Sequence, residues 1–294
     1  MAERSLGQRG RPVQPGRGPG AVTAIPDTPA GGFRLPRLGR LRGIANAALG
    51  IAALMLLWWL GGLAVANDPD MFAFADFAPA PTLAALQDIV TSGEVWQMSG
   101  PSLYRVGYGM GIAAAIGVPV GIAIGRIPFL REITNVPFQF LRMISPLSWM
   151  PIAVMAYDTW DGAIVFLIAV AAIWPILFST AAGVRRIDPS WLKVARNLGA
   201  NPFHMLFVVI LPAIAVDILT GLRLALGVAW VVLVPAEYLG VTSGLGYAIN
   251  DARDTLDYSR LAAVVVVIGV IGFALDWLCM LAIKKFNWVR DTAH

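Results

Sequence analysis

VARNLGANPFHMLFVVILPA, residues 194–213, is a polar and interrupted stretch between two long apolar runs. It contains an arginine, two asparagines and a histidine, with Gly-Ala-Asn-Pro in the middle and Leu-Pro near the end. Asp188-Pro189 and Asn201-Pro202 each place proline after a good N-cap residue, a favoured way to begin a helix. We therefore expect two short helices that meet at Gly199-Ala200, with the next membrane crossing starting at Pro212. From the residues alone, this helix pair either docks a partner or lies on the lipid surface.

The whole chain is strongly apolar. Hydrophobic residues make up 57% and charged residues 14%, and the mean hydropathy is +0.70, which is outside the range of soluble domains. Runs of about 20 apolar residues, long enough to cross the hydrocarbon core of a bilayer, recur along the chain. They lie at 44–66, 106–125, 162–184, 213–236 and 261–283, and a sixth at 137–157 contains Arg142 and three prolines. The sequence thus predicts an all-α membrane protein with six transmembrane helices.

Basic residues are distributed unevenly between the two sides of this predicted domain. With Met1 in the cytoplasm, the cytoplasmic segments hold 17 of the 22 Lys and Arg residues. The opposite loops hold three of these and 11 of the 18 acidic residues. The cytoplasmic segments would be 1–43, 126–132, 185–212 and 284–294, and the outer loops 67–105, 158–161 and 237–260. The positive-inside rule therefore predicts that both termini and the loop 185–212 are cytoplasmic.

The expected organisation is one membrane domain with a tail at each end. Residues 1–43 are rich in Arg, Gly and Pro and predict a disordered basic tail that lies against anionic lipid headgroups rather than binding nucleic acid. Residues 44–283 form the transmembrane domain, and 284–294 form a cytoplasmic tail. The apolar run before Ala64-Val65-Ala66 is too long for a signal peptide core, so we expect an uncleaved first helix.

Several kinds of chemistry find no support in the sequence. The single cysteine, Cys279, excludes a disulfide framework, and His204 and His294 do not form a metal site with it. No G-x-x-x-x-G-K-[ST] motif is present to hold nucleotide phosphates. We therefore expect no cofactor, no bound metal and no catalytic residues in this chain.

Two further patterns concern helix packing. A series of glycines in the second crossing predicts close approach to a neighbouring helix. The series consists of Gly107, Gly111, Gly117, Gly121 and Gly125. Residues 82–96 carry apolar side chains at helical spacing and predict an amphipathic helix at the outer membrane surface.

The opening stretch resembles the EAA loop of type I ABC transporter permeases. That loop has Glu-Ala-Ala, then a glycine after three residues, and an isoleucine and Leu-Pro further on. The matching positions here are Ala195, Gly199, Ile210, Leu211 and Pro212, whereas Lys193 and Val194 replace the glutamate and the first alanine.

Further segments resemble one branch of these permeases, the nitrate/sulfonate/bicarbonate type, which includes taurine and cyanate systems. The matching segments cover most of the chain in order, from about Pro81 to Trp288. They are Ser102–Val106, Leu141–Pro151, Thr220–Gly227, Ala236-Glu237 and Gly244–Gly246.

The resemblance implies a fold, partners and a function. The fold would be the transmembrane domain of a type I ABC importer, with its core at about 100–283 and a cytoplasmic coupling loop at 185–212. The partners would be a second permease subunit (a homodimer), two cytoplasmic ATPase subunits that hydrolyse ATP, and a periplasmic or lipid-anchored solute-binding protein. The substrate would be a small anion such as nitrate, a sulfonate such as taurine, or bicarbonate, carried across the bacterial inner membrane. The alternatives are a different small organic solute in the same kind of permease, or a self-sufficient secondary transporter.

Read together with this resemblance, the charges and turns of the sequence suggest residues for each role. Coupling to the ATPase would involve Lys193, Ala195, Arg196, Gly199, Asn201, Pro202 and Pro212. Ionisable groups inside a membrane are costly and mark functional sites, so the translocation path would be lined by Arg142 and Arg223. Ser145, Ser148 and Thr220 either line the path as well or cap the kinks at Pro146 and Pro151. An outer gate would involve Glu237, Gly244 and Gly246, unless that segment is a simple solvated turn. For Arg223 the residues leave an alternative open, in which it pairs with Asp276 or Asp217 and only holds helices together.

Overall fold

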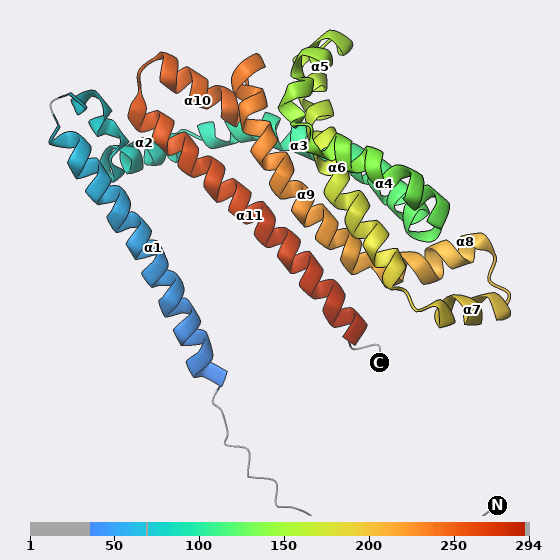
Figure 1. Ribbon diagram of the computed structural model, residues 1–294. Coiled ribbons are helices and arrows are strands. Elements are labelled where there is room, and N and C mark those ends of the chain that lie inside the picture. The colour runs from blue at the N-terminus through green and yellow to red at the C-terminus, as the bar shows by residue number, and fades with distance from the viewer. Residues whose placement is uncertain (1–35, 69, 292–294) are drawn as a thin grey trace, which may run out of the picture. The chain divides into compact units, whose positions relative to one another are not determined.

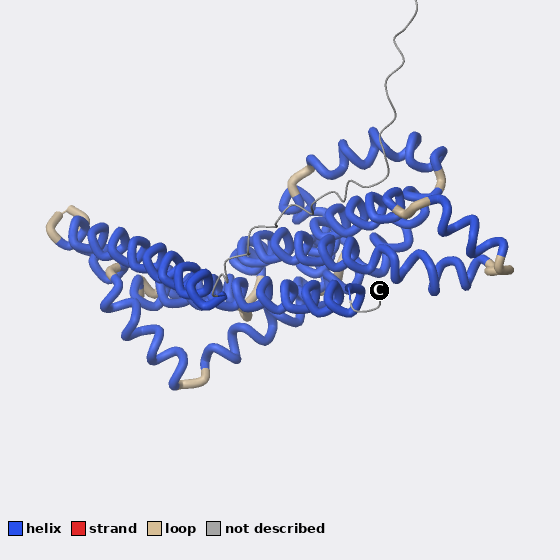
Figure 2. The backbone as a smooth tube through the Cα atoms, turned by 90° about the horizontal axis from the view of Figure 1, so that it is seen from below, coloured by secondary structure: helices blue, strands red, loops and turns tan. Residues whose placement is uncertain are grey.

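The computed structural model describes residues 36–68 and 70–291, and every regular element in these ranges is a helix (Figures 1 and 2). The predictions for residues 1–35 and 292–294 lie outside the described residues. Five helical segments are long and apolar enough to span a membrane, and a shorter apolar one is Pro146–Ala156. The five are Ala45–Ala66, Glu94–Arg126, Trp160–Arg186, Pro202–Gly240 and Tyr258–Lys285. The predicted class, an all-α multi-pass membrane protein, is confirmed.

The contacts divide the chain after Ala52. Helix α1 (Pro36–Ala66) begins before that point, eight residues ahead of the predicted first crossing. The unit that starts at Ala53 contains the rest of α1 and all the helices that follow it. Within it, the indole Nε1 of Trp58 on α1 donates a hydrogen bond to the carbonyl of Phe77, at 2.9 Å, in the short helix η1 (Phe72–Phe77).

The core is built from three long helices, α3 (Glu94–Arg126), α6 (Trp160–Arg186) and α9 (Leu211–Gly240). Helix α6 packs against both of the others and is the most buried, with Ile164, Leu167 and Ile168 fully enclosed. Helix α11 (Tyr258–Asp291) packs against α9. Figure 1 shows these long helices running side by side.

Glycine allows α3 to approach α6 closely. A Cβ atom added at Gly121 would lie 2.7 Å from the carbonyl oxygen of Leu177, and one at Gly109 would lie 2.5 Å from Ile168 Cγ2. The predicted close approach is present, but the predicted face was partly wrong. Gly107 and Gly111 have no neighbour within 4 Å of an added Cβ, because the α6-facing stripe repeats every four residues and passes through 109, 113, 117, 121 and 125.

The region predicted as a single crossing at 137–157 is not one continuous helix. It consists of α4 (Pro128–Met143), the 3-10 turn η2 (Pro146–Trp149) and α5 (Met150–Ala156). Ile144 and Ser145 between them have ψ angles of 125° and 128°. The residue before a proline disfavours the helical region because the proline ring clashes with it, so Ser145-Pro146 ends the helix.

The predicted amphipathic helix at 82–96 is also divided. Helix α2 (Pro79–Thr91) ends at a turn through Ser92 and Gly93, and α3 begins at Glu94, twelve residues before the predicted crossing at 106. Ile89 faces the protein interior, whereas Val90 is 58% exposed.

The remaining helices lie at the two ends of the bundle. Helix α7 (Pro189–Asn197), helix α8 (Pro202–His204) and the C-terminal part of α11 lie at one end (Figure 1). Helices α2, α5 and α10 (Leu245–Asp254) lie at the other. We refer to these as the elbow end and the α10 end.

The contact between α3 and α6 yields a stability prediction. Gly121→Ala should destabilise the protein by about 1–3 kcal/mol, because the new methyl group meets a backbone carbonyl that cannot rotate away. Gly111→Ala is the matched control, since its methyl group enters open space and alanine favours the helix. Denaturant unfolding of both variants in mixed micelles measures the difference, and equal stabilities would contradict the inferred packing.

Candidate functional sites

Residues 188–212, which include most of the polar stretch between the two apolar runs, form a sharp elbow. Asp188 caps α7, with its Oδ1 accepting from the backbone N–H of Ser190 at 2.8 Å. Asn201 caps α8 in the same way, accepting from the N–H of His204 at 2.8 Å. The hydrogen bond from Ser190 lowers the pKa of the Asp188 carboxyl group. Both predicted helix starts are therefore present.

The turn between the two helices depends on Gly199. Its φ angle is +83°, in the left-handed region that side chains with a Cβ rarely adopt. After this turn the chain stays helical from Pro202 to Gly240. The segment η3 (Met205–Ile210) is π-helical, and the N–H of Leu211 donates to the carbonyl of Leu206, five residues back. This wider turn lies directly before Pro212, which has no N–H to donate.

The elbow is fixed on its inner side and apolar on its outer side. Met205 and Ile210 are buried against Val184 and Ile214, with Ala195 packed on this cluster. Large apolar side chains on the outer side remain exposed, and Leu198 is 82% exposed. The others are Trp191, Val194, Phe203, Phe207 and Val208. The predicted coupling residues Lys193, Arg196, Gly199, Asn201, Pro202 and Pro212 are exposed as well. A gathering of exposed apolar side chains indicates an interaction surface.

A groove of about 930 Å³ runs along α9 in the middle of the bundle. Its α9 wall is one helical stripe made of Thr220, Arg223, Leu224, Gly227, Val228, Val231, Val232 and Pro235. The break after α4 contributes Ser145, Pro146 and Leu147, and α11 contributes Asp276. Three of the predicted path residues, Ser145, Thr220 and Arg223, are thus brought together here. Arg142 and Ser148 are not among the lining residues, and the guanidinium of Arg142 lies over the Phe178 ring, 5.3 Å from its centroid.

Arg223 forms a two-point ion pair with Asp276 at this groove. Its Nε lies 2.6 Å from Oδ1 and its Nη2 lies 2.7 Å from Oδ2. Of the two partners considered from the sequence, the structure shows Asp276, since Asp217 pairs with Arg186 instead. The two side chains remain 37% and 44% exposed. Both lie nine or more residues, about 13 Å, from the nearer end of their spans. Charges so exposed at this depth are costly in lipid, so this face needs water or another protein surface.

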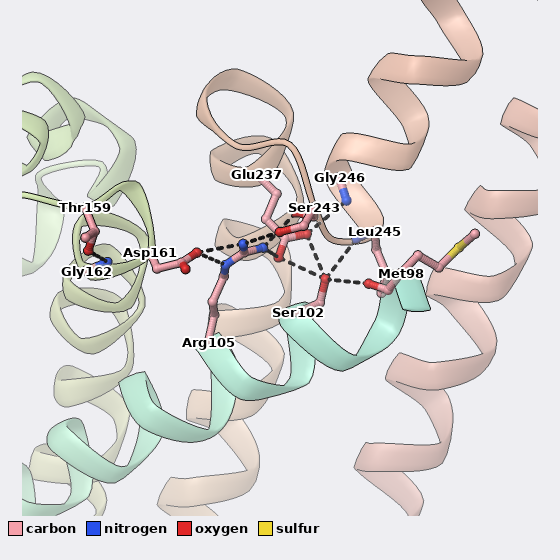
Figure 3. Close-up of polar contacts among 10 residues, drawn as sticks. All are labelled: Met98, Ser102, Arg105, Thr159, Asp161, Gly162, Glu237, Ser243, Leu245 and Gly246. Atoms are coloured by element: carbon pink, nitrogen blue, oxygen red, sulfur yellow. Dashed lines mark hydrogen bonds and ion pairs between the residues drawn. The ribbon is translucent and has the colours of Figure 1, made fainter. Parts of the chain in front are cut away.

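A second charged cluster lies at the α10 end, and Figure 3 shows its polar contacts. Arg105 on α3 and Glu237 on α9 are 2% and 0% exposed, and Arg105 Nη1 lies 2.5 Å from Glu237 Oε1. The Nε of Arg105 donates to Asp161 on α6 at 2.8 Å, and its Nη1 and Nη2 donate to the carbonyl and hydroxyl oxygens of Ser243, each at 2.9 Å. One guanidinium therefore joins three helices and the turn before α10.

Glu237 also receives donors from the start of α10. The Ser102 hydroxyl donates to its carboxylate at 2.8 Å and accepts from the N–H of Leu245 at 2.9 Å, while the N–H of Gly246 donates to Oε2 at 3.0 Å. Gly244 has a φ angle of +109°, and a Cβ there would lie 2.6 Å from the carboxylate. The predicted gate residues are thus parts of one buried network rather than of a solvated turn.

Sequence reasoning missed the central residue of this cluster. Arg105 was assigned to an outer loop because the predicted crossing began at residue 106. A signal was nevertheless present, since Ser102–Val106, Ala236-Glu237 and Gly244–Gly246 were all segments of the family resemblance. In the structure these three segments meet at one point.

Comparison with known proteins agrees with this fold. A solved inward-facing structure of the MetNI methionine ABC transporter superposes with a TM-score of 0.52 over 64% of this chain and 94% of that one, at 15% identity. The fold is therefore that of an ABC importer transmembrane subunit. The profile of the family described as "Binding-protein-dependent transport system inner membrane component" matches residues 117–286, and the chain belongs to this family.

Curated relatives fall within the branch that the sequence resembled. The bicarbonate transport system permease protein CmpB of Synechococcus elongatus is 42% identical over 63% of this chain. The nitrate import permease protein NrtB of Synechocystis is 35% identical over 60%. The taurine transport system permease protein TauC of Escherichia coli is 32% identical over 77% of this chain and 82% of its own length. The chain spans slightly less than two thirds of CmpB and NrtB, 66% and 64% of their lengths.

The buried cluster yields a second stability prediction. Glu237→Ala should cost about 3–5 kcal/mol, because it leaves the enclosed Arg105 without its main partner. Asp161→Asn, at a carboxylate that is 58% exposed, should cost less than about 1 kcal/mol. Unfolding of both variants in mixed micelles compares the two costs. If Glu237→Ala proved no less stable than Asp161→Asn, the buried ion pair would not be holding the α10 end together.

Proposed function

We propose that this chain is the membrane-spanning permease subunit of an ATP-driven importer for a small oxyanion. The supporting observation is the single helical segment Pro202–Gly240. It carries the second arm of the elbow at one end, the groove-lining stripe with Arg223 in the middle and the buried Glu237 at the other end. A force applied to the elbow is therefore transmitted to the groove and to the α10 end, because a packed helix moves as a rigid body.

The partner at the elbow is a cytoplasmic ATPase subunit. The elbow presents exposed apolar side chains together with Lys193 and Arg196 on a short, doubly capped frame. Such a surface fits a groove in a soluble partner, and the family is one of subunits of transport systems. In this proposal, ATP is hydrolysed by the partner and this chain performs translocation only.

The partner at the groove is a second copy of the chain. The half-exposed pair of Arg223 and Asp276 cannot face lipid tails, and neighbouring Val228 and Val231 give that face an apolar border. Two copies that face each other would enclose the grooves and form one polar path between apolar walls. Ser145 and Thr220 would then add hydroxyl groups to that path.

The proposed substrate follows from the relatives and from the charge in the groove. The relatives are named for the transport of bicarbonate, nitrate and taurine. Bicarbonate and nitrate are oxyanions, and taurine carries a sulfonate group. A guanidinium binds such groups through paired hydrogen bonds. Arg142 lies outside the groove, so Arg223 is the favoured path residue.

The proposed orientation places the elbow and both termini in the cytoplasm. The α10 end then faces outward, where a solute-binding protein would deliver its cargo. Glu237, Gly244 and Gly246 hold α10 at this end and are the proposed outer gate.

A transport assay tests the function directly. The chain, co-purified with its ATPase and its binding protein in proteoliposomes, should take up nitrate, bicarbonate or taurine only with ATP. Gly199→Val should uncouple transport, because a β-branched residue is strained at a φ of +83°, whereas Gly199→Asn should largely retain it since asparagine tolerates this region. ATP-independent uptake by the chain alone would refute the proposal.

Thiol labelling tests the orientation. In a Cys279→Ser background, a membrane-impermeant maleimide added to intact cells should label Asp254→Cys on α10 and not Lys193→Cys on α7. Both positions are exposed, so a difference reports sidedness rather than burial. Permeabilised cells serve as the control and should allow both to react. Labelling of the α7 position in intact cells would reverse the assigned topology.

A further inference from the structure

The ion pair at the groove leaves one side of the Arg223 guanidinium unoccupied. A guanidinium has five N–H donors arranged along two edges that can each hold two oxygen atoms. Asp276 takes the edge formed by Nε and Nη2, and these two contacts are the hydrogen bonds that Arg223 makes within the described residues. The second edge, formed by Nη1 and Nη2, is therefore free to bind a ligand.

Within the described residues, the groove lining contains no carboxylate besides Asp276, so the free edge of Arg223 is open to a dissolved anion. Arg223 and Asp276 are the charged residues of the groove lining, and hydroxyl groups come from Ser145 and Thr220. The Thr220 hydroxyl donates to the carbonyl of Val216 at 2.7 Å, which leaves the free edge of Arg223 and the Ser145 hydroxyl as the side-chain donors of the groove lining. The other lining residues are apolar. Among the lining residues, Arg223 is thus the one cation.

The carboxylate of Asp276 sets the strength of such a site. In the empty groove it balances the charge of Arg223, so the pair as a whole is neutral. An anion that arrives gains two hydrogen bonds from the free edge, but it also approaches Asp276, which repels it. A site that combines these two effects binds weakly and releases its ligand readily, which a path through a membrane requires.

We propose that the Nη1–Nη2 edge of Arg223 is a two-point binding site for one oxyanion group, of the nitrate, bicarbonate or sulfonate kind, with Asp276 as its fixed counter-ion. The inference rests on the proposed function and names the place in the groove where the anion binds. It also assigns Asp276 a role that a scaffold pair would not have, namely keeping the affinity low.

The test measures the preference of the groove for anions without needing transport. Val228→Cys in a Cys279→Ser background places a thiol in the groove lining. The full-length protein in nanodiscs is treated with two methanethiosulfonate reagents of similar size, one bearing a sulfonate and one a trimethylammonium group. The sulfonate reagent should react about tenfold faster relative to the same reagents on free thiol, and nitrate should slow it.

Variants at the ion pair decide between a binding site and a scaffold. Arg223→Gln should abolish both the anion preference and the protection by nitrate, whereas Asp276→Asn should increase both, again by about tenfold. Ser148→Cys is the matched position, since it is exposed on η2 but lies outside the groove, and it should show neither effect. If Arg223→Gln fails to fold, Arg223→Lys should keep the charge preference and lose most of the nitrate protection, because lysine lacks the two-point edge.

The outcomes separate this inference from the proposed function. An unchanged rate ratio in Arg223→Gln, or weaker anion preference in Asp276→Asn, would overturn the binding site even if the complete importer transports anions. An anion-selective groove in a complex that transports no anion would instead remove the proposed function and leave the site in place.

Discussion

The close approach of α3 to α6 is the contact on which the rest of the structure depends. Glycines at positions 109, 117, 121 and 125 bring the two backbones together without intervening side chains. In a membrane there is little hydrophobic force between helices, so such close packing has to supply the association energy. With α3 fixed on one side, α6 offers its other side to α9, where Gly221 packs against Ser179 and Ile176. The three-helix core then positions Arg105 on α3, Asp161 on α6, and Arg223 and Glu237 on α9.

Helix α9 carries one residue of each of two ion pairs, and the two pairs differ in how far they are buried. Arg105 and Glu237 are buried. The polar side-chain atoms that do not join the two residues bond to Ser102 on α3, Asp161 on α6, Ser243 in the turn before α10, or Gly246 in its first turn. Such a pair holds one arrangement, because removing either charge leaves the other buried without compensation. Arg223 and Asp276 use the same chemistry, but they are half-exposed to a groove and retain unused donors. The open pair therefore keeps a guanidinium edge that a ligand can reach, whereas every guanidinium nitrogen of the closed pair already has a partner.

Two interruptions of helical regularity shape the groove and the elbow. Ser145-Pro146 ends α4 and places both residues in the wall of the groove. The π-helical turn before Pro212 allows the elbow helix to continue into α9 without a break, so that the elbow and the groove belong to one rigid unit. Breaks of this kind are tolerated in membrane domains where the freed backbone groups face protein or a cavity rather than lipid.

The sequence by itself determined the class, the five long apolar helices and the elbow, because these depend on local properties. Apolar length, helix caps and a glycine turn are encoded within a few residues, and the Asp188, Gly199 and Asn201 predictions needed no distant partner. The division of 137–157 and the start of α3 at Glu94 were missed because helix boundaries depend on what covers the backbone at each end. Only the tertiary structure decided which charges meet. Arg223 pairs with Asp276 rather than with Asp217, and Arg105 lies in a buried pair with Glu237 rather than in an outer loop. The partners in each pair are more than 50 residues apart in sequence, so both pairings depend on how α3, α6, α9 and α11 pack.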